Sequence, residues 1–138
     1  MSLISSKGIY GLEALYTLSK YNPKQPISMK DISSNTNISQ KYLEQIFNKL
    51  LHSNIIKSIR GPKGGYILNK SPKDISVKDV LNILEDDIKI INNTKINDPI
   101  LNIFLNKISI DIKNLFNINL DEINKYSEKY NENLHYNI

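Results

Sequence analysis

The chain of 138 residues contains no cysteine, so no disulfide can stabilise it and no thiol can act as a nucleophile. Its apolar runs are far shorter than the roughly 20 residues that a membrane-spanning helix needs. Residues 1–7 also lack the hydrophobic segment of a signal peptide. We therefore expect a cytoplasmic protein that does not bind membranes.

Histidine is also rare, occurring only at His52 and His135, and neither lies near a serine and an acid in a recognisable catalytic order. The glycines of residues 61–65 precede an expected strand instead of opening a helix, as a phosphate-binding loop would. Asp86 and Asp87 suit a solvated helix end better than a cation site. These features predict that the chain is not an enzyme and binds no metal ion.

Acidic residues are scarce in the first half of the chain. Residues 1–70 contain ten Lys or Arg and three Asp or Glu, whereas residues 71–138 contain eight and eleven. Frequent lysine from AT-biased coding would not explain why acids are missing from one half only. We expect the positive half to contact phosphates and the other half to contact protein.

One glycine-rich segment is especially informative, Arg60-Gly61-Pro62-Lys63-Gly64-Gly65-Tyr66. The β-type residues on either side, 55–59 and 66–68, would pair as a hairpin whose tip has unusual backbone angles. Only Arg60 and Lys63 carry long side chains there, and the negative potential of a DNA minor groove attracts Arg. The segment predicts a DNA-binding wing, although a surface hairpin with two solvated charges would have the same pattern.

Two helices expected before the wing have the pattern of a helix-turn-helix. Ser28, followed by Asp31, is typical of a capped helix start, and this short helix would end near Asn35. Ser39 is a second good N-cap, for a helix that would continue to His52. That helix has an apolar face formed by Leu43, Ile46, Phe47, Leu50 and Leu51, and its opposite face carries Gln40, Lys41, Glu44 and Gln45 near the start.

Several motifs together have the order and spacing of one family. They are Ser39-x-x-Tyr42-Leu43-Glu44-Gln45-Ile46, the wing from Ser58 to Tyr66, Lys7, Gly8, Tyr10 and Gly11 in the first helix, and Ser76 to Glu85 after the wing. They resemble the winged-helix repressors that include the iron-sulfur cluster regulator IscR, the nitric oxide sensor NsrR and the cysteine-metabolism repressor CymR. The resemblance covers residues 1 to about 88, roughly two thirds of the chain.

The chain departs from the cluster-binding members of this family. Those members carry three cysteines in the loop before the dimerisation helix, but the corresponding residues 86–98 contain none. No thiolate can therefore hold an iron-sulfur cluster here. The resemblance is closest to the cysteine-free, cysteine-metabolism branch, and it implies no cofactor.

The second half is expected to contain a long helix that opens at Asp98-Pro99. Its apolar residues exceed what a small domain core requires, and they are Ile100, Leu101, Phe104, Leu105, Ile108, Ile112, Leu115 and Phe116. Packing on its own domain would also explain them, but the resemblance and the need for two DNA half-sites favour a homodimer.

The predicted fold class is mainly α with a small β-hairpin. We expect a winged helix-turn-helix DNA-binding domain at residues 1–85, a linker, long dimerisation helix and short last helix at residues 86–130, and a flexible tail at residues 131–138. The first helix, about residues 6–21, should place Ile9, Leu12, Leu15, Tyr16 and Leu18 inward. The last helix, about residues 119–130, should place Leu120, Ile123 and Tyr126 on one side.

Roles on DNA can be assigned to individual residues. The candidates for the major groove are Gln40, Lys41, Glu44 and Gln45, and the wing would place Arg60, Gly61, Pro62, Lys63 and Gly64 at the minor groove. The candidates for phosphate contacts are Lys7, Tyr10, Ser28 and the N-cap Ser39. Tyr42 could reach a phosphate or belong to the helix packing.

The tail residues Tyr136, Asn137 and Ile138 resemble the end of the cysteine-metabolism repressor. Serine acetyltransferases dock to O-acetylserine sulfhydrylase through a C-terminal isoleucine, whose carboxylate replaces that of the amino-acid substrate. A peptide ending in Ile138 could dock in the same way, or the tail could fray. The docking hypothesis makes O-acetylserine sulfhydrylase (cysteine synthase) a partner.

Taken together, the sequence predicts a homodimeric repressor of cysteine or sulfur metabolism genes that binds an AT-rich inverted repeat in double-stranded DNA. Two alternatives stay open. One is a transcription factor of the same family controlled by a small effector bound directly in the dimer region. The other is a winged-helix module that binds protein and has no specific DNA site.

Overall fold

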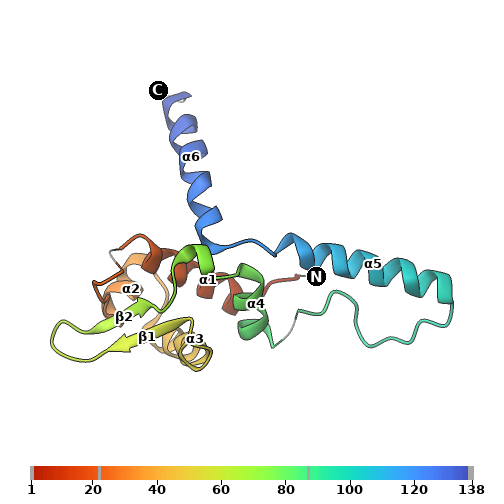
Figure 1. Ribbon diagram of the computed structural model, residues 1–138, viewed down its shortest axis with the longest axis horizontal. Helices are drawn as coiled ribbons and strands as arrows, with labels where there is room; N and C mark the ends of the chain where they lie inside the picture. The colour runs from red at the N-terminus through yellow and green to blue at the C-terminus, as the bar shows by residue number, and fades with distance from the viewer. Residues whose placement is uncertain (1, 22, 87, 137–138) are drawn as a thin grey trace.

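The structure, a computed structural model, describes residues 2–21, 23–86 and 88–136. Its elements in chain order, with η for a 3-10 helix, are α1 (Ser6–Ser19), α2 (Met29–Thr36), α3 (Gln40–His52), β1 (Ile56–Ile59), β2 (Gly65–Leu68), η1 (Pro72–Asp74), α4 (Val77–Glu85), α5 (Pro99–Leu115), η2 (Leu120–Asn124) and α6 (Lys125–Tyr136). A body made of α1 to α4 and the hairpin lies at one side, and α5 and α6 extend from it in two directions (Figure 1). The predicted fold class is confirmed.

Side-chain caps start the helices where the sequence predicted them. The hydroxyl of Ser28 accepts a hydrogen bond from the Asp31 amide at 3.1 Å, and that of Ser39 accepts one from the Tyr42 amide at 3.2 Å. The Asp98 carboxylate accepts two, both at 2.9 Å, at the start of α5. These bonds satisfy amides that have no partner inside the helix, so each helix begins at a defined residue.

A tight turn joins α2 to α3. Asn37 takes the left-handed conformation, with φ 57°, and its amide donates to the Ser33 carbonyl at 2.9 Å. The next residue, Ile38, is buried, and its carbonyl accepts a hydrogen bond from the Ser33 hydroxyl at 2.6 Å. These two hydrogen bonds hold the turn, so residues 33–38 themselves determine the angle between α2 and α3.

The apolar face of α3 forms the centre of the core. Leu43, Ile46, Phe47 and Leu50 are all buried, as the spacing predicted. The Phe47 ring meets the Tyr66 ring edge-on, with the ring centres 4.8 Å apart. This contact joins α3 to the hairpin through the core.

Close packing of α1 on α4 corrects one sequence-based prediction. A side chain at Gly11 would collide with Leu84 of α4, and one at Gly8 would collide with Glu85. The face of α1 that contacts α4 therefore carries Gly8 and Gly11, which let the two helices approach closely, together with Leu12. Ile9, which we predicted to point inward, lies off this face and is 53% exposed.

The hairpin is joined by a third extended segment. In the antiparallel pair, Ile56 lies opposite Leu68 and Ile59 opposite Gly65. Ile27, just before α2, forms an isolated bridge with Tyr66 through hydrogen bonds of 3.0 and 2.8 Å. A side chain at Gly65 would collide with the Ile27 backbone, so this position needs glycine to allow the approach.

The chain returns to the body after α5. Leu120 is buried in the main core, and its amide donates to the Ile75 carbonyl at 2.9 Å. At the other end of the connection, Ile88 is buried against α4 residues Val77 and Leu81. The body therefore includes residues from the region 86–130 that we assigned to the linker, the dimerisation helix and the last helix. Helix α5 itself has no buried residue.

The last helix differs from the one that we predicted for residues 119–130. A 3-10 turn, η2, comes first, and α6 then runs from Lys125 to Tyr136. Leu120 is buried, but Tyr126 is 64% exposed, so they do not share one packed side. Residues 131–136, predicted as tail, continue the helix because no glycine or proline interrupts residues 120–138. Asn137 and Ile138 lie outside the described residues.

An ion pair marks the junction between η2 and α6. Lys125 Nζ lies 2.8 Å from Glu122 Oε1. The hydrogen bond to Glu122 and the charge of this carboxylate raise the pKa of Lys125.

Within the described ranges, none of the helices combines the length and apolar character that a membrane crossing needs.

Candidate nucleic-acid interface

The exposed side of α3 carries the polar residues that the sequence assigned to the major groove. Gln40, Lys41, Glu44 and Gln45 are all exposed, while the opposite side of the helix is buried. They occupy the N-terminal half of the helix, which is the part that contacts base edges in helix-turn-helix proteins. Their amide, ammonium and carboxylate groups can form hydrogen bonds to the major-groove edges of adenine, guanine and cytosine.

The wing ends in a tight turn that exposes two cations. The Gly64 amide donates to the Gly61 carbonyl at 2.9 Å, which closes a four-residue turn with Pro62 and Lys63 in the middle. Gly61 has φ +123°, a conformation that other residues rarely adopt, and a side chain at Gly64 would collide with the turn's own backbone. Arg60 and Lys63 are exposed on this narrow tip. Such a tip can enter a minor groove.

The wing and the helix-turn-helix are joined rigidly. The bridge from Tyr66 to Ile27 connects the hairpin to the residue before Ser28, the N-cap of α2. The ring contact of Tyr66 with Phe47 connects the hairpin to α3. The structure therefore holds the wing and α3 in one fixed arrangement, which a two-groove contact requires.

The predicted phosphate contacts fall into two groups. Ser28 and Ser39 are N-caps, so their hydroxyls lie beside free amides at helix starts, where a phosphate is favoured. Tyr10 of α1 packs edge-on against Tyr42 of α3, with the ring centres 5.5 Å apart. Tyr42 is half-buried against the core, so its ring packs the two helices together. Lys7 lies half-buried on α1, one turn before Tyr10.

Sequence reasoning missed two residues on these surfaces. Asn48 is exposed on α3 and lies four residues after Glu44, which extends the polar face by one turn. Lys57 is exposed on β1 and adds a third cation to the wing, after Arg60 and Lys63. The helical spacing from Glu44 was a sufficient signal for Asn48.

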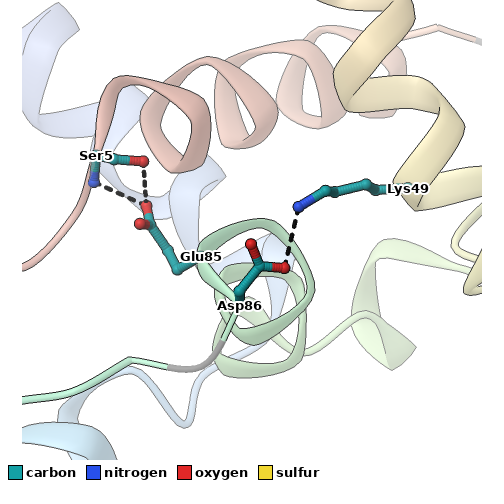
Figure 2. Close-up of polar contacts among 4 residues, drawn as sticks. All are labelled: Ser5, Lys49, Glu85 and Asp86. Carbon is teal, nitrogen blue, oxygen red and sulfur yellow. Dashed lines mark hydrogen bonds and ion pairs between the residues drawn. The ribbon is translucent and has the colours of Figure 1, made fainter.

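Polar contacts at the end of α4 hold α1 and α3 in place (Figure 2). The Glu85 carboxylate accepts hydrogen bonds from the Ser5 amide and hydroxyl, at 2.7 and 2.8 Å, at the start of α1. Asp86 forms an ion pair with Lys49 of α3 at 3.1 Å. These contacts orient the helix that carries the candidate base-contacting residues, and they lie where the chain leaves the body towards α5.

A metal or cluster site is not indicated by the donor groups. The sequence has no cysteine, so thiolate ligation is impossible. Across the part of the chain that the structure describes, no three His, Asp or Glu side chains gather where they could hold an ion. The arrangement instead presents a polar recognition helix and a cationic wing.

These features define a winged helix-turn-helix protein of the DNA-binding type. The chain belongs to the Rrf2 family, described as an iron-dependent transcriptional regulator, whose family model matches residues 4–126. The family resemblance predicted from the motifs is thereby confirmed.

Individual relatives agree with this assignment. The HTH-type transcriptional regulator CymR of Bacillus subtilis is 41% identical over 85 residues, which is 62% of each chain. IscR of Pectobacterium carotovorum is 35% identical over 85 residues, covering 62% of this chain and 52% of that one. The structure of CymR, the global cysteine regulator of B. subtilis, superimposes with a TM-score of 0.82 and 32% identity, covering 91% of this chain and 98% of that chain.

The relatives are named as transcription regulators and not as enzymes, which agrees with the prediction that the chain is not an enzyme. The sequence matches span less than two thirds of these relatives, 62% of CymR and 52% of IscR. The family model and the superposition on CymR extend further, through residue 126 and over 91% of this chain.

Proposed function

We propose that the protein is a homodimeric transcriptional repressor that binds an AT-rich inverted repeat. The observation that carries this proposal is the joint placement of the exposed polar face of α3 and the cationic wing on one rigid body. Gln40, Lys41, Glu44 and Gln45 would read bases in the major groove, and Arg60 would enter the adjacent minor groove. A narrow minor groove with strong negative potential is a property of A-tracts, which supports an AT-rich site.

The second part of the proposal is the dimer. Helix α5 exposes Ile100, Ile103 and Phe104, and each is more than half exposed. An apolar surface of this kind on an extended helix is costly in water and favours pairing. Pairing of two α5 helices around a two-fold axis would present two winged helices to two half-sites. For this reason we expect the DNA site to be an inverted repeat.

Selection from random DNA duplexes tests the DNA-binding proposal. The intact protein should enrich an inverted repeat with AT-rich segments where the wings lie, and footprinting should show two protected half-sites. Enrichment of no sequence, with binding to every duplex lost equally as salt rises, would indicate the alternative of a protein-binding module.

We further propose that the protein controls cysteine or sulfur metabolism genes through O-acetylserine sulfhydrylase. Support comes from the similarity to CymR, which is named as a cysteine regulator, and from the C-terminal residues Tyr136, Asn137 and Ile138. In this proposal the Ile138 carboxylate occupies the enzyme's site for its amino-acid substrate. Because α6 continues to Tyr136, docking as an extended peptide would require its last turn to unwind.

Calorimetry can test this partner directly. The intact protein should bind purified O-acetylserine sulfhydrylase, the variant lacking Ile138 should not, and O-acetylserine should compete. Binding that persists without Ile138 would reject the docking mechanism. Absence of any binding would instead favour the alternative regulator that binds a small effector directly.

A further inference from the structure

A cavity of about 310 Å³ lies in the body, and no described residue of α5 or α6 lines it. Its walls come from the end of α1 and the segment that follows it, and from β2 and the segment that follows β2. The lining residues are Leu18, Ser19, Tyr21, Pro23, Gln25, Ile27, Tyr66, Ile67, Leu68, Asn69, Lys70, Ser71 and Pro72. The volume is at the small end of ligand pockets, which suits a compact molecule better than a peptide.

The lining has a defined chemical character. Aliphatic and aromatic residues such as Leu18, Ile27 and Leu68, together with two prolines, are eight of the thirteen lining residues, and they favour an apolar ligand body. Lys70, which is exposed, is the one ionised side chain among the lining residues, and none of them is an acid. A ligand with a single anionic group therefore matches the charge of the cavity, whereas a cationic ligand would meet uncompensated repulsion.

The cavity also touches the contacts that fix the wing. Ile27 and Tyr66, which line it, form the bridge between the hairpin and the start of α2. Tyr21, which also lines it, accepts a hydrogen bond from Asn35 of α2 at 3.1 Å. An occupant would thus contact the hairpin on one side and the chain leading into α2 on the other.

We propose that this cavity binds a small carboxylate with a compact apolar body, held at its charged end by Lys70, and that its occupancy changes the operator affinity. Such a site is distinct from an effector site in the dimer region. A ligand can change operator affinity only if it binds the DNA-competent arrangement of wing and helices with a different affinity from other arrangements. The difference would arise at Ile27, Tyr66 and Tyr21, because these lining residues also make the contacts between the hairpin, the chain before α2 and α2 itself. The effect on DNA rests on the proposed function, but the binding does not.

The absence of tryptophan makes a site-specific measurement possible. A Tyr21→Trp variant would carry the only tryptophan, at the cavity wall, and a Tyr126→Trp variant would carry one on α6 as a remote control. The probe is 3-phenylpropionate, and its uncharged amide is the matched control ligand. We expect a saturable fluorescence change with the acid in the first variant and none in the second.

Two lysine variants test the role of charge in the Tyr21→Trp background. Lys70→Gln should weaken binding of the acid by about threefold, to the level of the amide, as loss of an exposed ion pair does. Lys73→Gln removes an exposed cation that does not line the cavity, so it should leave the preference for the acid unchanged. No binding of the acid to the wild-type protein in calorimetry up to about 10 mM, a tenfold excess over a 1 mM dissociation constant, would overturn the proposed site, whatever the Tyr21→Trp variant shows. An equal affinity for acid and amide would also overturn it.

The coupling to DNA is measured with the selected operator and the wild-type protein. We expect the acid to change operator affinity by about fivefold, the lower end of typical allosteric coupling, and the amide to have a smaller effect. Binding in the fluorescence experiment with unchanged operator affinity would reject the coupling. Failure to bind any operator both with and without the acid would reject the proposed function, while the fluorescence titration would still decide the site.

Discussion

The winged-helix body and helix α5 both carry large apolar side chains at helical spacing, but only the body buries them. On α3, Ile46 and Phe47 are 0% and 1% exposed, whereas Ile103 and Phe104 on α5 are 70% and 57% exposed. The difference arises because α1, α2, α4 and the hairpin cover one face of α3, while α5 leaves the body (Figure 1). An apolar pattern thus predicts that a face will be covered without saying which chain covers it.

The comparison assigns different roles to the two regions. The body is closed by its own residues, including Leu120 after α5, so it can hold the wing and α3 rigidly. Helix α5 lies away from the body and has no buried residue, which suits pairing with a second copy (Figure 1). Substitutions in the body should therefore change folding, and substitutions in α5 should change association.

The largest effect is expected for Phe47→Ala. The ring is buried and contacts Tyr66, so its removal should lower the free energy of unfolding by about 3–5 kcal/mol. Urea denaturation followed by circular dichroism measures this change. A loss below about 1 kcal/mol would show that the core is not organised around α3.

The matched substitution in α5 is Phe104→Ala. If two α5 helices pair, each copy loses about 1.5–3 kcal/mol of apolar burial, so the dimer dissociation constant should rise at least about tenfold. Sedimentation velocity across a concentration series measures it. The body should remain folded by circular dichroism. An unchanged dissociation constant would show that this face of α5 does not lie in a dimer interface. The contrast between a self-packed body and a pairing α5 would then be wrong.

A smaller and more local effect is expected for Glu44→Ala. Loss of its carboxylate should relax base preference at one step of each half-site by about 1–3 kcal/mol, with other positions unchanged. Competition binding with operators altered one base pair at a time measures this. Glu128→Ala, on exposed α6, is the charge-matched control. An unaltered preference at every step would show that Glu44 does not read bases.

The smallest effect is expected for Lys49→Ala. Its ion pair with Asp86 is largely exposed, so the loss in unfolding free energy should be at most about 1 kcal/mol. Thermal denaturation at low and high salt would detect it, since salt should reduce the difference between variant and wild type. A loss of several kcal/mol, insensitive to salt, would contradict this view of the contact.

Local signals made much of the body predictable. The N-caps Ser28, Ser39 and Asp98 fixed three helix starts, and the glycines of the wing fixed the hairpin, because each depends on neighbouring residues only. The exposed candidates on α3 followed from helical spacing. Their contacts with DNA stay predictions.

Long-range contacts were not predictable in the same way. The bridge of Ile27 to Tyr66 and the burial of Leu120 depend on segments far apart in the chain. We predicted Ile9 to point inward because it is apolar. The side of α1 that packs closely on α4 instead carries Gly8 and Gly11, which apolarity alone does not predict. The end of α6 was missed because polar residues without a breaker are compatible with both helix and tail.

The most direct test of the account is the operator affinity of Arg60→Ala, measured by fluorescence anisotropy beside Lys95→Ala. Both variants lose one exposed cation, but only Arg60 lies on the wing. We predict that Arg60→Ala weakens binding at least about tenfold with the dimer intact, and that Lys95→Ala binds as the wild type does. Equal affinities for both variants would contradict the claim that the wing and α3 of this body form the DNA-binding surface.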